Sequence, residues 1–89
     1  MSATVVVTYG NALDAAAATR RTALQYEVGV AFMPLDPPAH AAAHREVTNQ
    51  GPEPILVGPH PVAARAYYLA PGERVSFQRQ GVLFAAVAP

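Results

Sequence analysis

Short apolar runs separated by proline and glycine are the feature that most constrains how this chain can fold. Val47 to Phe84 reads VTNQGPEPILVGPHPVAARAYYLAPGERVSFQRQGVLF, and the 89-residue chain holds nine Pro and six Gly. Strand-length runs at a spacing of about 8–12 residues, each ended by turn residues, are typical of an all-β sandwich or barrel. The sequence therefore predicts a mainly β fold, a small antiparallel β-sandwich or barrel, with residues 1–89 in a single β-rich domain.

The clearest strand pattern begins at Leu24. From there to Met33, apolar residues alternate with small or polar ones, so that Leu24, Tyr26, Val28, Val30 and Phe32 share one face of a period-two strand. The other segments expected as strands are Thr4–Tyr9, Arg45–Asn49, Pro54–Gly58, Ala66–Leu69, Arg74–Gln78 and Val82–Val87.

Two segments do not read as strands. Residues 12–23 are rich in alanine and follow Asn11, a good N-cap, which favours a short N-terminal helix; a loop is the alternative. Residues 34–44 contain Pro34, Pro37 and Pro38, which disfavour regular helix at the start of this stretch. We expect residues 34–44 to form an extended Pro-rich arm or linker.

The composition indicates more apolar surface than a chain of this length can bury. Hydrophobic residues make up 52% and charged residues 13%, against about 25% charged residues in typical soluble domains. We therefore expect apolar surface to meet another chain; codon bias toward Ala, Pro, Gly and Arg is the alternative explanation. The interface candidates are Val5, Val7, Pro37, Pro38, Tyr67 and Tyr68.

Charge and hydropathy argue against two classes of partner. Six Arg balance six acidic residues and are scattered along the chain, whereas nucleic-acid binders usually carry a clustered basic excess. No apolar run approaches the roughly 18 residues of a membrane span, and the first residues do not resemble a signal peptide. We expect neither a nucleic acid nor a membrane as partner.

The sequence carries no strong catalytic or metal-binding motif. His40 and His44 have helical spacing, and His60 is a third candidate ligand, but no HExxH motif is present and the chain has no cysteine. GxSxG, P-loop and GxGxxG patterns are also missing, and the acidic residues are scattered among turns. We expect no metal, no cofactor and no enzymatic activity.

The order of turns and strands in the second half supports a resemblance. Asn49-x-Gly51 is followed by an apolar run ending in Val57-Gly58, by Tyr68-Leu69-Ala70-Pro71-Gly72-Glu73, by Val75-x-Phe77, and by a closing Leu83-Phe84-Ala85. This order resembles small β-rich virion proteins of tailed bacteriophages and related phage-like particles. It covers about the last half of the chain.

The resemblance implies a structural virion component, assembled in the host cytoplasm, that docks on a capsid as a decoration protein or forms part of a head or tail appendage. The implied partners are other copies of the chain, for example in a trimer, and a virion shell or appendage protein. The alternative is a carbohydrate- or receptor-binding module of a phage spike or fibre. In that alternative, Arg65, Tyr67 and Gln78 would meet a glycan.

Overall fold

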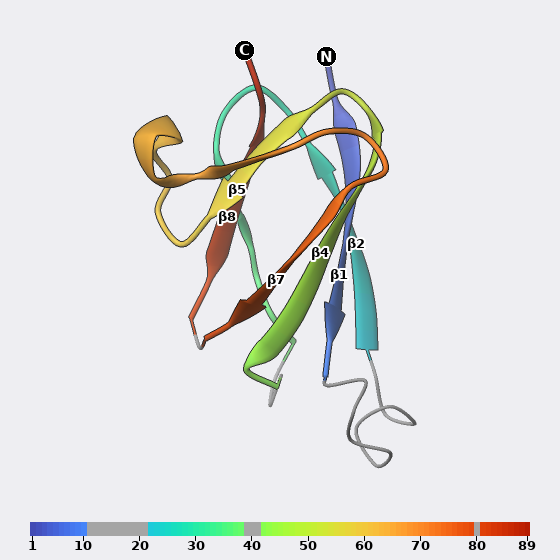
Figure 1. Ribbon diagram of the computed structural model, residues 1–89, viewed down its shortest axis with the longest axis vertical. Coiled ribbons are helices and arrows are strands. Elements are labelled where there is room, and N and C mark those ends of the chain that lie inside the picture. The colour runs from blue at the N-terminus through green and yellow to red at the C-terminus, as the bar shows by residue number, and fades with distance from the viewer. Residues whose placement is uncertain (11–21, 39–41, 80) are drawn as a thin grey trace.

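The protein is described here from a computed structural model, which covers residues 1–10, 22–38, 42–79 and 81–89. The described residues form eight strands and one short 3₁₀ helix (Figure 1). In chain order these are β1 (Ala3–Tyr9), β2 (Thr22–Val28), β3 (Met33–Leu35), β4 (His44–Pro52), β5 (Ile55–Gly58), η1 (Ala63–Arg65), β6 (Tyr67–Leu69), β7 (Arg74–Gln78) and β8 (Leu83–Val87). The expected mainly β fold is confirmed.

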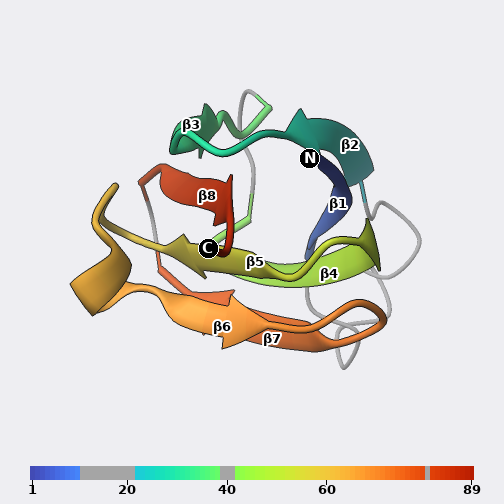
Figure 2. The same ribbon diagram turned by 90° about the horizontal axis from the view of Figure 1, so that it is seen from above.

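The strands form two four-stranded antiparallel sheets, in the orders β2-β1-β4-β7 and β3-β8-β5-β6. Seen from one end, β2 and β3 lie along one border of the sandwich, and β6 and β7 lie along the opposite border (Figure 2). Residues from both sheets contribute to one core, so the fold is a sandwich.

The strands pair in the order found in a jelly roll. β5 pairs with β6, β4 with β7, β3 with β8 and β2 with β1, so the pairs alternate between the two sheets as they would in one long rolled-up hairpin. In an ordinary jelly roll, the strand that pairs with β2 would follow directly after β8 as the last strand of the chain. Here that strand is β1, and the N and C ends lie at the same end of the sandwich (Figure 1). The topology is therefore a jelly roll opened between β8 and β1.

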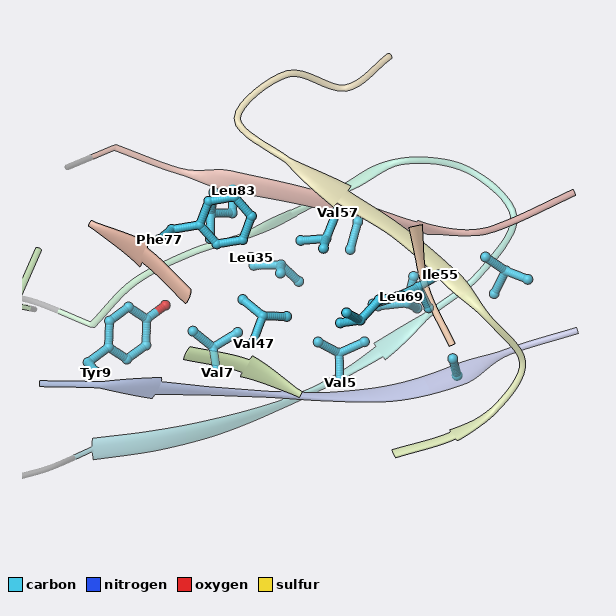
Figure 3. Packing of buried hydrophobic residues seen from close by; sticks show 14 residues of the cluster. Val5, Val7, Tyr9, Leu35, Val47, Ile55, Val57, Leu69, Phe77 and Leu83 are labelled. Atoms are coloured by element: carbon cyan, nitrogen blue, oxygen red, sulfur yellow. The ribbon is translucent and has the colours of Figure 1, made fainter. Parts of the chain in front are cut away.

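The core is built from the inward side chains of both sheets (Figure 3). Val5, Val7 and Val47 of one sheet face Ile55 and Val57 of the other, and all five have no exposed surface. Period-two alternation explains the arrangement, since β1 reads buried and half-buried in turn along its whole length. Phe77 and Leu83 extend the core toward the end at which β1 finishes.

A tight turn over residues 70–73 joins β6 to β7. Gly72 has φ +88°, and the Glu73 N–H donates to the Ala70 carbonyl at 3.0 Å. Proline at the second position and a glycine with positive φ at the third are characteristic of a type II turn.

The long alternating strand expected from Leu24 to Met33 is wrong in its extent. β2 ends at Val28, and after a crossing at Gly29–Phe32 the chain continues as β3 in the other sheet. Val30, expected on the apolar face, is 71% exposed. Period-two alternation sets the face within each strand, but it does not record that the chain changes sheets partway.

The arm expected over residues 34–44 is also corrected at its two ends. Pro34 and Leu35 belong to β3, and Leu35 is 1% exposed in the core; His44 begins β4. Proline is tolerated at Pro34 because β3 is an edge strand, with a partner on one side only. Residues 39–41 lie outside the described residues, as does the expected helix apart from Thr22 and Ala23, which belong to β2.

Candidate docking surface

The two sheets present very different outer faces. Because side chains alternate across a strand, residues between the core positions point away from the other sheet. In the sheet β3-β8-β5-β6, the buried positions Leu35, Leu83, Val57 and Leu69 fix the inward register. Their strand neighbours form the outer face.

That outer face is apolar, and we call it the apolar face. Leu56 of β5 lies between Ala86 of β8 and Tyr68 of β6, and Phe84 of β8 lies between Pro34 of β3 and Gly58 of β5. The apolar face therefore consists of Pro34, Leu56, Gly58, Tyr68, Phe84 and Ala86. Gly58 and Ala86 are buried within the chain itself, so Pro34, Leu56, Tyr68 and Phe84 supply its accessible surface. Its only side-chain hydrogen-bonding group is the Tyr68 hydroxyl, and it carries no charge.

The outer face of the other sheet is polar. Its residues alternate with the core positions of β1, β2, β4 and β7, and it bears a hydrogen bond from Thr4 Oγ1 to Glu27 Oε1 of 2.7 Å and an Arg74–Glu46 ion pair of 3.7 Å. This polar face comprises Thr4, Val6, Thr8, Gln25, Glu27, Glu46, Thr48, Arg74, Ser76 and Gln78. It has the composition expected of a solvent-facing sheet, which the apolar face lacks.

The adjacent tyrosines of β6 extend the apolar face at its border. Tyr68 points outward and is 61% exposed, opposite Leu56. Tyr67 has the inward parity, but because β6 is an edge strand its ring is still 59% exposed, and it packs edge-on against Phe77 with centroids 5.6 Å apart. Val62, near η1, adds a further exposed apolar side chain at 47%. Large exposed aromatic side chains are enriched in protein interfaces.

The structure places the predicted interface residues in three different settings. Val5 and Val7 are corrected, because β1 is a central strand and both side chains are fully buried in the protein's own core. Pro37 and Pro38 are half-buried after β3. Tyr67 and Tyr68 are exposed, so they alone of the six candidates present large apolar surface.

The residues considered for a glycan do not converge. Arg65 lies in η1 and Tyr67 begins β6, close in the chain. Phe77 points inward and contacts Tyr67, so its neighbour Gln78 points to the polar face of the other sheet. A sugar lying on Tyr67 would not meet Gln78.

The histidines considered for a metal are also dispersed. His44 begins β4, His60 is exposed in the connection before η1, and His40 lies outside the described residues. No group of three or more His, Cys, Asp or Glu side chains able to hold a metal ion occurs within the part of the chain that the structure describes. Nor does that part contain a helix long and apolar enough to cross a membrane.

Reasoning from the sequence missed Leu56, Phe84 and Pro34 as surface residues. The signal was present, because the runs around Leu56 and Phe84 are apolar at every position. Such a run is compatible with a strand buried on both faces as well as with one that keeps an apolar outer face. Only the two-layer arrangement shows that these side chains point away from the core, with Pro34, Leu56, Tyr68 and Phe84 left exposed or partly exposed.

Comparison with protein families, with curated proteins and with solved structures returned no significant match.

Proposed function

We propose that the chain is a structural subunit of a virion-type particle and that it packs through its apolar face against other copies of itself in the particle shell. The observation that supports this proposal is the contrast between the two outer faces. One sheet carries an ion pair and a row of polar side chains, while the other carries Pro34, Leu56, Tyr68 and Phe84 without a single charge. A surface of this kind is stabilised when water leaves it.

The absence of charge favours a second copy as the occupant. When two identical faces meet across a two-fold axis, every charged residue risks lying close to its own like charge, and the apolar face has none. The exposed ring of Tyr68 and the flat Pro34 side chain supply contact area without repulsion.

The size of the face favours many weak contacts over one strong one. Four strands about 4.8 Å apart, each three to five residues long, give a planar footprint of roughly 250 Å². Stable pairwise interfaces bury about 800 Å² per partner. A subunit with this face would associate weakly in pairs and firmly in a lattice where several contacts act together. Viral capsid domains are among the known uses of the jelly-roll architecture, which adds support by analogy of fold.

Sedimentation velocity across protein concentrations up to about 1 mM tests the proposal, since weak contacts have dissociation constants in that range. The natural chain should show a mass that rises with concentration. Leu56→Glu places a charge in the middle of the apolar face and should remain monomeric. Thr48→Glu, at a matched central position on the polar face, should behave like the natural chain.

A natural chain that stays monomeric at about 1 mM contradicts self-packing. Equal association of all three proteins would show that the apolar face is not the surface involved. Circular dichroism of each variant establishes that it is folded before its mass is interpreted.

A further inference from the structure

Two polar side chains are buried on the inner face of β4, and their surroundings differ sharply. Asn49 has no exposed surface, and its amide is fully used: Nδ2 donates to the carbonyls of Glu53 at 2.9 Å and Leu69 at 3.0 Å, and Oδ1 accepts from the Gly51 N–H at 2.7 Å. Arg45, four residues earlier, is 3% exposed. Asn49 shows how this core satisfies a buried polar group, and Arg45 departs from that pattern.

The Arg45 guanidinium has few acceptors among the described residues. One Nη1–H group donates to the Gly81 carbonyl, and the guanidinium lies over the Tyr9 ring at 5.5 Å from its centroid. Its Nε–H is buried without a hydrogen-bond partner. The ion pair between Arg74 and Glu46 does not involve Arg45, and none of the carboxylates among the described residues pairs with Arg45. A buried cation without an anion is strongly unfavourable.

A second unused polar group lies beside Arg45. Tyr9 is the cross-strand neighbour of Arg45, it is 3% exposed, and its buried hydroxyl has no hydrogen-bond partner. In Figure 3 this hydroxyl points away from β1 into the interior. The Tyr26 hydroxyl nearby donates instead to the Asp36 carbonyl at 2.6 Å. The Tyr26 hydroxyl oxygen lies close to the Tyr9 hydroxyl, so Tyr9 has a neutral acceptor nearby while Arg45 Nε–H has none. Both donors lie at the same end of the sandwich.

We infer that this end of the sandwich, where β1 finishes and β8 begins, binds a small oxyanion next to Arg45 Nε–H and the Tyr9 hydroxyl. The site offers a positive charge and hydrogen-bond donors, which is the chemistry that recognises a carboxylate or a phosphate. A metal ion would meet a guanidinium here and be repelled. The oxyanion would supply both the missing negative charge and the missing acceptors. This inference is independent of the packing proposed for the apolar face.

Thermal unfolding of the full chain in sodium acetate and in sodium phosphate tests the inference, with sodium chloride at the same ionic strength as reference. A ligand that binds only the folded chain raises Tm with its concentration. We expect at least one of the two oxyanions to raise Tm by about 4 °C or more at tenfold excess over its dissociation constant, beyond the effect of chloride. Acetate and phosphate together distinguish a carboxylate site from a phosphate site.

Two substitutions locate the effect. Tyr9→Phe removes only the hydroxyl, so without added oxyanion it should leave Tm unchanged or raise it, and with oxyanion the gain should shrink severalfold. Arg45→Met removes the charge and keeps much of the apolar volume, and it should abolish the response. Thr8→Val on the polar face is the control and should respond as the natural chain does.

Either of two results would overturn the inference. One is an equal response to oxyanion in the natural chain, Tyr9→Phe and Arg45→Met. The other is no response beyond that to chloride in the natural chain. Asp14, the one acidic residue outside the described ranges, is tested by Asp14→Asn. An unresponsive natural chain that becomes responsive in Asp14→Asn would show that the chain already supplies its own carboxylate.

Discussion

Replacing Asn49 by leucine should destabilise the fold strongly, although the two side chains have similar volumes. Leucine has a similar volume, so no large cavity forms, but three side-chain hydrogen bonds are lost. Each contributes about 1 kcal/mol net, and a polar group left buried without a partner adds about 1–3 kcal/mol. The Leu69 carbonyl and the Gly51 N–H lie in buried surroundings. We expect a loss of about 4 kcal/mol in the free energy of unfolding.

Asn49→Asp separates donor loss from acceptor loss. The carboxylate still accepts from the Gly51 N–H, but it turns an oxygen toward the carbonyls of Glu53 and Leu69 where Nδ2 had donated. Burial and the facing carbonyls should raise the pKa of this carboxyl in the folded chain. A group whose folded pKa is raised loses stability as pH increases, so the deficit should shrink as pH falls toward the usual carboxyl range near 4.

Urea denaturation followed by circular dichroism measures both variants. Thr48→Val, at the next residue but on the polar face, is the control and should change stability by less than about 0.5 kcal/mol. If Asn49→Leu also stays within about 1 kcal/mol of the natural chain, the three side-chain hydrogen bonds of Asn49 do not stabilise the fold to the extent expected.

Two further perturbations follow from the packing and from burial. Gly58→Ala should destabilise the fold by about 2 kcal/mol, because its Cβ would lie 2.7 Å from the Arg65 carbonyl oxygen. Gly29→Ala, whose Cβ would have nothing within 4 Å, should be neutral or slightly stabilising in the same urea titration. Equal effects of the two substitutions would contradict the close approach at Gly58. Burial raises the pKa of Tyr26 in the folded chain, so the unfolded chain ionises first and stability should fall as pH rises above about 10. Tyr26→Phe should flatten this fall, and parallel pH profiles would refute it.

The sequence was informative about strands and much less so about their arrangement. The strands expected over Thr4–Tyr9 and Arg74–Gln78 lie at or within one residue of the bounds of β1 and β7, because strand composition and turn residues are local properties. The crossing at Gly29 was missed because the alternating pattern continues across it while the chain changes sheets. The pairing of β1 with β4 depends on contacts between distant segments, which no local pattern encodes.

The candidate surface and the candidate anion site show the same division. Tyr68 was identified from the sequence, because an adjacent tyrosine pair on a strand must turn one ring outward. Val5 and Val7 were misplaced, because a triple valine fits a central strand as well as an interface. Arg45 drew no attention as a site residue, since an arginine leading a strand reads as solvent-exposed until the fold shows it buried beside Tyr9.

The position of β8 has a consequence for biosynthesis. β8 lies between β3 and β5, so one of the two sheets lacks an interior strand until residues 83–87 have left the ribosome. Until then β3 has no pairing partner in its sheet, and Leu35 and Val57 lack the side chains of Leu83 and Ala85 that cover them in the finished fold. The early strands must therefore remain soluble without their partners until β8 is available. We expect the sandwich to form in one late step and not strand by strand during translation.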